Sequence, residues 1–325
     1  MCDGRASLVI ASHGVPHRND RFPRTMKILL ATDGSSHAQA AESLLTGLPV
    51  PSDSELCLVA VVEAPTWQSD VASEHAALRE ELAGYRREVE ERLEREVERL
   101  KSRFGRVSGV VLSGNVVEQI CQLATDRQAD LIVAGARGGS KIRRWLLGGT
   151  SDRLARHAPC DVLVVRPRDD SAEPARGLKR VLVAIDGSAS SRGAVERLAS
   201  LPLGEECEVI VFQVLAVVRS FRMDIVEQSG DLWEAERRQA HDDLNWAADR
   251  LRPVTPHVRT VLHEAEYVAD EILTVAEEHR ADLIVVGHQG RSRVSQFLLG
   301  SVSSAVLRHA ESSVWVVRTE DADVS

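Results

Sequence analysis

Two glycine patterns of identical spacing are the residues of this chain best suited to holding a phosphate group. Each pattern has a glycine, two residues, a second glycine, nine residues and a third glycine. Its members are Gly135, Gly138 and Gly148 in the first copy and Gly287, Gly290 and Gly300 in the second. Glycine lets a backbone approach an anion closely, and the N–H groups at a helix start carry partial positive charge. The patterns therefore predict nucleotide binding, and their duplication allows two sites.

An aspartate before a Gly-Ser pair stands at a matching position upstream of each glycine pattern. Asp33 ends the apolar run that starts at Lys27, and Asp186 ends the run that starts at Arg180. Both aspartates therefore stand at a predicted strand end, the edge at which doubly wound sheets bind ligands. A plainer alternative stays open, since an Asp-Gly-Ser sequence also forms turns and helix caps. The first glycine of each pattern could likewise serve only a tight turn.

Several kinds of catalytic motif are absent from the sequence. It has no Gly-x-x-x-x-Gly-Lys-Ser/Thr loop for phosphoryl transfer, no Gly-x-Gly-x-x-Gly fingerprint and no zinc-type ligand spacing. His288 lies inside the second glycine pattern, but the sequence shows no serine or aspartate partner for it. No general base is recognisable beside a nucleophile. We therefore expect binding rather than catalysis, with no catalytic residue and no metal ligand supplied by the protein.

Composition and charge limit the kinds of partner and the cellular compartment that suit this protein. The formal net charge of −9 argues against general nucleic-acid binding, which needs a basic surface. No segment approaches the roughly 20 apolar residues of a membrane span. The five cysteines are scattered, and Cys57 and Cys207 fall in equivalent strands, where buried free thiols are expected. A cytoplasmic location, with its reducing conditions, fits this pattern.

The elements that must position these residues are themselves duplicated. Residues 129–166 align without a gap on residues 281–318, and half of the aligned positions are identical. A repeat length of about 150 residues is that of one ordinary domain and is too long for a solenoid unit. We therefore predict an N-terminal extension (1–25), a first domain (26–168), a linker (169–177), a second domain (178–320) and a tail (321–325).

Short apolar runs alternate with helical patterns in both copies. In the first copy, strands are expected at 27–32, 55–62, 107–112, 130–135 and 161–166. In the second copy, they are expected near 180–185, 207–215, 257–262, 282–287 and 313–318. A long helix over about 74–104 carries one apolar stripe that includes Tyr85. Continuous apolar strands suit a parallel sheet, so we predict an α/β fold of two tandem, doubly wound, Rossmann-like domains with five strands each.

Taken together, these residues resemble the universal stress protein family. The nucleotide motif of that family is Gly, two residues, Gly, nine residues, Gly and then Ser or Thr. The second copy matches it throughout, with Ser301 at the last position, whereas the first copy has Gly149 there. The resemblance covers nearly all of residues 26–320 and includes the aspartate that follows the first strand of each copy.

The resemblance implies that the chain binds ATP, with Mg²⁺ held through the phosphates. The aspartates are then expected near the adenosine, the backbone of the second strands near the adenine edge, and the glycine loops and helix starts around the phosphates. The full set of expected contacts is Asp33, Val61, Gly135, Gly138, Gly148, Gly149, Thr150, Asp186, Val214, Gly287, Gly290, Gly300, Ser301, Val302 and Ser303. Because Gly149 lacks the hydroxyl of Ser301, the second site is predicted to bind more tightly.

The implied function is an ATP-binding regulator of a stress response, in which nucleotide occupancy biases the conformation. Two alternatives stay open: a weak ATPase, and a nucleotide-independent scaffold or chaperone-like dimer. The resemblance also implies that the last strands, 162–166 and 314–318, pair with each other and make the repeats an intramolecular pseudo-dimer. A further homodimer of the whole chain rests on analogy alone.

Overall fold

One continuous sheet runs through the computed structural model, which describes residues 25–63, 76–138, 147–167, 177–217, 230–290 and 299–319. Its strand order is β3-β2-β1-β4-β5-β10-β9-β6-β7-β8. The first half comprises β1 (Lys27–Ala31), β2 (Glu55–Val62), β3 (Arg106–Ser113), β4 (Leu131–Gly135) and β5 (Asp161–Val165). The second half comprises β6 (Arg180–Ile185), β7 (Glu208–Ala216), β8 (His257–Ala265), β9 (Leu283–Gly287) and β10 (Ser313–Val317). Outward from the contact of β5 with β10, the two halves follow the same relative order.

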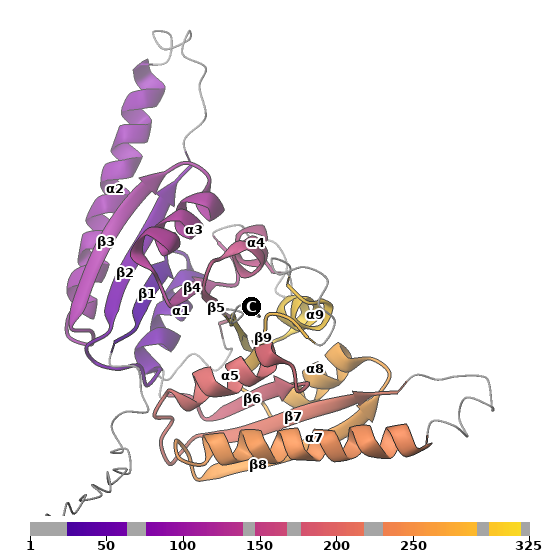
Figure 1. The fold of residues 1–325 in the computed structure, drawn as a ribbon. Coiled ribbons are helices and arrows are strands. Elements are labelled where there is room, and N and C mark those ends of the chain that lie inside the picture. Colours follow the sequence, from indigo (N-terminus) through magenta and orange to yellow (C-terminus); the bar gives the residue numbers. More distant parts are fainter. Residues whose placement is uncertain are drawn as a thin grey trace, which may run out of the picture.

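Helices cover both faces of this sheet (Figure 1). One face carries α1 (Ser36–Gly47), α2 (Ala76–Leu100), α5 (Ala189–Ala199) and α7 (Gly230–Leu251), which share one apolar core. The other face carries α3 (Val116–Arg127), α4 (Gly149–His157), α8 (Val268–Glu278) and α9 (Ser301–His309), which share a second core. Strand pairs within each half are parallel, because helices connect successive strands. The fold is therefore α/β, with two doubly wound, Rossmann-like halves of five strands, as the sequence predicts.

The long helix α2 ends earlier than its apolar pattern predicts. It stops at Leu100, although the pattern continues to Phe104. The Nη2 of Arg103 donates to the carbonyl oxygen of Leu48 at 2.8 Å and so holds the chain in a turn. Phe104 is still buried, but Tyr85 is 51% exposed and does not belong to the packed stripe. Tertiary contacts, rather than the spacing of apolar residues, set the end of this helix.

Strands β5 and β10 join the two halves and pair antiparallel. The facing residues are Val162 and Val316, Leu163 and Trp315, and Val164 and Val314. Trp315 is 1% exposed, so the pairing buries the largest side chain of either strand. The contact that the sequence predicts between the two final strands is therefore present.

Two arginines just beyond these strands reach across the junction in a reciprocal arrangement. Arg166 donates from Nη2 to the carbonyl oxygen of Leu307 at 2.8 Å, near the end of α9. Arg318 donates from Nη2 to the carbonyl oxygen of Arg156 at 2.8 Å, near the end of α4. The last carbonyl groups of a helix lack donors within the helix and carry partial negative charge. Each half therefore caps the final helix of the other.

Some sequence predictions fall on parts of the chain that are not described. Nearly all of the predicted N-terminal extension, linker and tail lies outside the described residues, as does the predicted start of the long helix. Among the helices that the structure does describe, none combines the length and the apolar character needed to cross a bilayer.

Candidate nucleotide-binding sites

The first candidate site lies where β1 and β4 end. Asp33 follows β1, and its Oδ1 accepts a hydrogen bond from the Ser35 N–H at 2.9 Å. Ser35 in turn caps α1, since its Oγ accepts from the Ala38 N–H at 3.3 Å. Gly34 allows this tight turn with a φ of +76°. The Asp-Gly-Ser sequence thus does form a turn and a cap, but this uses one carboxylate oxygen of Asp33 and orients the other.

The second carboxylate oxygen of Asp33 faces the glycine loop. A Cβ atom on Gly138 would come within 2.7 Å of Asp33 Oδ2, so a larger residue there would push this carboxylate aside. At the other end of the loop, the Gly148 N–H donates to the carbonyl oxygen of Ala136 at 2.8 Å. The chain therefore leaves β4 beside Asp33 and returns to the end of β4 just before α4 begins.

The first glycine of each pattern is a packing residue. A Cβ atom on Gly135 would lie 2.6 Å from the carbonyl carbon of His37, so glycine lets α1 pack directly on β4. Gly287 stands in the same relation to Ser190 on α5, at 2.7 Å from its carbonyl carbon. Neither glycine has a positive φ. Close helix packing therefore accounts for glycine at both positions without a left-handed backbone conformation.

The start of α4 presents backbone donors next to this loop. Gly148 is its N-cap, and no side chain among the described residues caps the helix. The first N–H groups of a helix lack acceptors within it and carry partial positive charge. Apart from its chain neighbours and the backbone of its own helix, no described atom lies within 4 Å of a Cβ position on Gly149. Ser151 does not add a donor, because its Oγ already donates to the Gly135 carbonyl oxygen at 2.7 Å.

A cavity of about 150 Å³ lies between this loop, the strand ends and α3. Its lining combines the apolar residues Val59, Val61, Val116 and Ile120 with Asp33, Arg137, Gly138 and Thr150. An apolar pocket with a few polar groups beside it is typical of small-molecule sites. The expected contacts Asp33, Val61, Gly135, Gly138 and Thr150 all line this cavity, and Gly148 and Gly149 stand at the adjacent helix start.

The second half repeats this geometry at the ends of β6 and β9. Asp186 Oδ1 accepts from the Ser188 N–H at 3.0 Å. A Cβ atom on Gly290 would lie 2.8 Å from Asp186 Oδ2. The Gly300 N–H returns the loop to the carbonyl oxygen of His288 at 2.7 Å, and α9 begins at the next residue. The duplicated sequence therefore gives the same contacts at the described ends of both glycine patterns.

The residues at the start of α9 use their side chains differently from one another. Ser301 is exposed at the first helical position. Ser303 is buried, and its Oγ donates to the Gly287 carbonyl oxygen at 2.6 Å. The hydroxyl hydrogen of Ser303, expected to serve a phosphate, is thus already used within the protein. Val302 and Val214 are half-buried.

A buried histidine contact in the second half is one that the sequence does not reveal. His288 is 6% exposed, and its Nδ1 lies 3.0 Å from the Oγ of Ser190. Ser190 Oγ also accepts from the Gln289 N–H at 3.2 Å. The one indication in the sequence is Gly287, which requires α5 to pack closely against β9. Because both side chains are buried, this contact fastens α5 to the glycine loop.

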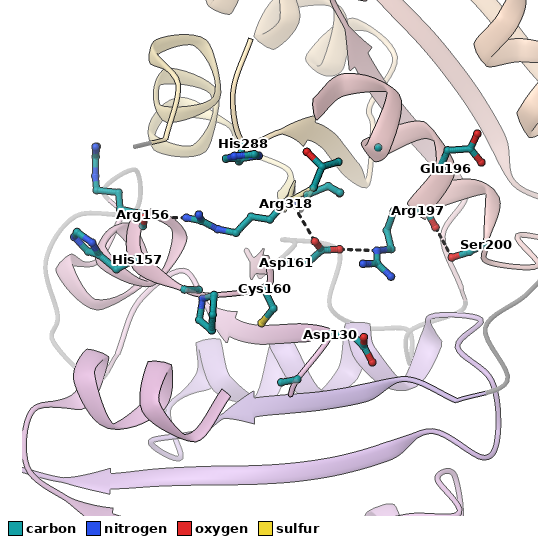
Figure 2. Close-up of a pocket in the computed structure, with 16 residues that line it drawn as sticks. Asp130, Arg156, His157, Cys160, Asp161, Glu196, Arg197, Ser200, His288 and Arg318 are labelled. Atoms are coloured by element: carbon teal, nitrogen blue, oxygen red, sulfur yellow. Dashed lines mark hydrogen bonds and ion pairs between the residues drawn. The ribbon is translucent and has the colours of Figure 1, made fainter. Parts of the chain in front are cut away.

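A larger cavity, of about 1020 Å³, lies between the two halves. Figure 2 shows Asp161 of the first half between Arg197 and Arg318 of the second. Asp161 is buried, with Oδ2 at 2.8 Å from Arg197 Nε and Oδ1 accepting from the Arg318 N–H at 2.9 Å. Burial raises the pKa of Asp161 to about 6, while Arg197 opposes the shift. Burial also raises the pKa of the Cys160 thiol to about 12, so this thiol stays neutral. The hydrogen bonds of Asp161 thus join the two halves beside this cavity.

Comparison with known proteins agrees with this duplicated architecture. The universal stress protein family matches residues 25–166 and, separately, residues 177–318. This chain belongs to the universal stress protein family. The two matches correspond to the two halves of the sheet, so it is a tandem universal stress protein.

Individual universal stress proteins resemble this tandem member over different lengths. One from Mycobacterium tuberculosis is 34% identical over 197 residues, which are 59% of this chain and 62% of that relative. The match thus spans less than two thirds of the mycobacterial protein. A putative universal stress protein of Staphylococcus aureus is 32% identical over 162 residues, covering 45% of this chain and 87% of the relative. The crystal structure of a universal stress protein from Archaeoglobus fulgidus has a TM-score of 0.61 at 20% identity and covers 91% of this chain and 97% of its own, which shows a shared fold.

Proposed function

We propose that this universal stress protein binds ATP and acts as a nucleotide-dependent regulator of a stress response. The observation that carries the proposal is the cavity of about 150 Å³ at the carboxyl edge of the first half. An apolar wall, the Asp33 carboxylate, a glycine loop and the start of α4 meet there. Doubly wound sheets bind their ligands at such an edge.

The two ends of ATP would find different surroundings in this cavity. The adenine would lie against Val59 and Val61, with backbone groups of β2 at its edge. Asp33 would accept hydrogen bonds from the adenosine. The phosphates would bind the N–H groups of the glycine loop and of the start of α4, where an anion is stabilised. Mg²⁺ would be held through the phosphates, since it commonly binds with few protein ligands and keeps its waters.

Regulation is proposed to act through contacts between α4 and α9. Asp152 on α4 accepts a hydrogen bond from Arg156 Nε at 3.0 Å and from Arg308 Nε on α9 at 3.1 Å. Arg156 also donates to Ser304 Oγ on α9 at 2.9 Å. Phosphates bound at the start of α4 would bind more tightly to one arrangement of these α4–α9 contacts than to another. A ligand with such a difference in affinity shifts the equilibrium between the two conformations. The two halves would then act as an intramolecular pseudo-dimer, with a homodimer of the whole chain as a further assembly.

The cysteines support a reducing compartment for this function. Cys57 and Cys207 are buried free thiols, and burial raises the pKa of Cys207 to about 11. Reduced thiols persist in the cytoplasm, so we propose that the protein acts there.

Calorimetric titration of the purified chain with Mg-ATP tests the binding proposal. Gly138→Val is the test variant, because its Cβ would meet Asp33 Oδ2 and block the loop, and it should lower the affinity about tenfold or more. Gly84→Ala is the matched control, since no described atom lies within 4 Å of the added Cβ. Mg-ATP at about 100 times its Kd should also stabilise the fold by about 2.7 kcal/mol. The proposal would be refuted if the titration gave no heat of binding and Mg-ATP gave no thermal stabilisation.

The nucleotide recovered from the protein separates regulation from the alternatives. After denaturation of protein incubated with Mg-ATP, recovery of intact ATP supports a regulator that senses occupancy. Progressive recovery of ADP supports a weak ATPase instead. Recovery of no nucleotide, together with no measurable binding, supports a scaffold whose contacts do not depend on ATP.

A further inference from the structure

Strand register identifies three residues that form one wall of the first cavity. Ala31 of β1 pairs with Val59 of β2 on one side and with Ala134 of β4 on the other. All three residues line the cavity. They are small side chains for a sheet of this kind, and the space in front of them stays open.

The same three positions in the second half are occupied by Ala184, Phe212 and Val286. Ala184 of β6 pairs with Phe212 of β7 on one side and with Val286 of β9 on the other. A phenylalanine thus stands where the first half has a valine, and a valine where it has an alanine. Phe212 is 0% exposed and Val286 is 3% exposed, and both belong to the apolar core beneath α8 and α9. By this register, their additional carbon atoms would occupy the region that is a cavity in the first half.

The Phe212 ring packs against a histidine that is itself in a polar contact. The ring meets His263 of β8 edge-on, with centroids 5.3 Å apart and an interplanar angle of 88°. His263 Nδ1 lies 2.7 Å from Glu271 Oε1 on α8. Moving the ring aside would disturb a close-packed core and this aromatic contact together. A nucleotide would therefore have to displace packed side chains to enter the second pocket.

The two glycine loops also differ in charge. Arg137 precedes Gly138 and lines the first cavity, whereas Gln289 precedes Gly290 in the second loop. The charge of Arg137 is also felt by a neighbouring side chain: burial lowers the pKa of His37, and the positive charge of Arg137 lowers it further. A guanidinium stabilises phosphate oxygens more than a neutral amide does, because its hydrogen bonds are charge-assisted. The first loop is therefore the better partner for a polyanion.

We infer that the first half of the chain holds the nucleotide and that Phe212 and Val286 close the corresponding pocket of the second half. The inference rests on the proposed function, because it chooses between the two sites at which ATP could bind. It reverses the ranking predicted from Ser301 and Gly149 at the helix starts. The second half must first have room for the adenine base before the Ser301 hydroxyl can add to the affinity for ATP.

Exchange of the wall residues between the halves tests this inference, with Mg-ATP titrated calorimetrically into the full chain. The wild type should bind about one nucleotide per chain. Val59→Phe combined with Ala134→Val fills the first cavity and should lower the affinity about tenfold or more. Phe212→Val combined with Val286→Ala should keep the first site and raise the stoichiometry toward about two.

An exchange in the loops covers the case in which the larger side chains prevent folding. Arg137→Gln leaves the apolar wall unchanged and should weaken binding about tenfold, because it removes the charge beside the phosphates. Gln289→Arg is its matched control in the closed half and should leave the affinity at the wild-type value. Circular dichroism and the melting temperature without ligand establish which variants are folded.

Three results would overturn the inference while leaving ATP binding intact. They are about two equivalent sites in the wild type, full affinity in the chain with Val59→Phe and Ala134→Val, and full affinity in Arg137→Gln. The inference would also be overturned if Gly300→Val lost binding while Gly148→Val did not. Absence of any binding by the wild type would instead refute the proposed function.

Discussion

At the scale of single residues, Gly135 shows what spacing can and cannot reveal. Its place in a phosphate-type pattern is evident from the sequence, but its closest contact is not. A side chain at Gly135 would collide with the backbone of His37 on α1, which lies far back in the chain. Asp33 was open to two interpretations, and the structure shows it in a turn with its second oxygen toward the glycine loop. The motif does not reveal Phe212, because it is defined by loop residues and does not include the strand behind the loop.

Gly135→Ala should destabilise the fold by about 1–3 kcal/mol, because the backbone of His37 must move to admit the new Cβ atom. Urea denaturation measures the free energy of unfolding. Gly84→Ala is the control, since its Cβ would enter open space in the middle of α2, and it should stabilise the fold by about 0.5–1 kcal/mol. The packing role of Gly135 would be wrong if the two variants changed stability equally.

At the scale of elements, the strands were predictable and the helix ends were less so. The inner strands are largely buried apolar runs, and the two edge strands β3 and β8 are only partly buried, yet all lie within a few residues of their predicted bounds. The end of α2 does not follow from its apolar pattern, because Arg103 bonds the carbonyl oxygens of Thr46 and Leu48, more than 50 positions earlier. The glycines locate the start of α4, but only the structure shows that Ser151 turns its hydroxyl to Gly135 instead of toward a ligand.

Gly149→Asp should move stability and binding in opposite directions. A carboxylate at the start of α4 complements the helix dipole and should stabilise the fold by about 0.3–1 kcal/mol, and no described atom outside its own helix and its chain neighbours lies within 4 Å of the added Cβ. The same charge should weaken Mg-ATP binding, because it repels the phosphates proposed to lie there. Thermal denaturation without ligand measures the first effect, and calorimetric titration measures the second.

Gly149→Ala separates charge from shape at this position. Alanine favours the helix without adding a negative charge, so its affinity for Mg-ATP should lie closer to the wild type than that of the aspartate variant. Equal affinities in the two variants would show that the phosphates do not bind at the start of α4.

At the scale of the whole molecule, the two halves share one sheet but meet asymmetrically. The pairing of β5 with β10 could be predicted, since apolar edge strands need a cover. The contacts beyond it could not, because they depend on the register of an antiparallel pair. The Arg318 N–H donates to Asp161 at 2.9 Å, whereas the Arg166 N–H donates to Ser313 Oγ at 3.2 Å. A buried carboxylate therefore stands on one side of the junction and a hydroxyl on the other.

This asymmetry makes a prediction about pH. The folded chain binds a proton at Asp161 more tightly than the unfolded chain, because burial raises the pKa from 3.8 to about 6. The resulting stability is fully present below about pH 4 and is lost as the pH rises through about 6. Relative to the variant Asp161→Asn, which cannot titrate, the wild type should lose up to about 3 kcal/mol of unfolding free energy between about pH 4 and pH 7. Urea denaturation of both proteins across this range measures the difference.

Asp152 provides a control, because its contribution to stability should depend on pH in the opposite direction. Burial acts to raise its pKa, but hydrogen bonds from Arg156 and Arg308 outweigh burial, and the pKa is lowered from 3.8. Its contribution to stability is therefore present above the ordinary pKa and is lost as the pH falls below it. The wild type should lose stability relative to Asp152→Asn on acidification. If Asp161→Asn gave a pH dependence of this same sign, the burial argument for Asp161 would be wrong.

A crystal structure of the chain grown with Mg-ATP tests the central claim most directly. We predict nucleotide density at the carboxyl edge of the first half, with the purine against Val59 and Val61 and the phosphates between Gly138 and the start of α4. The corresponding region of the second half should be filled by Phe212. Density for ATP only in the second half, or only in the large cavity between the halves, would contradict the account.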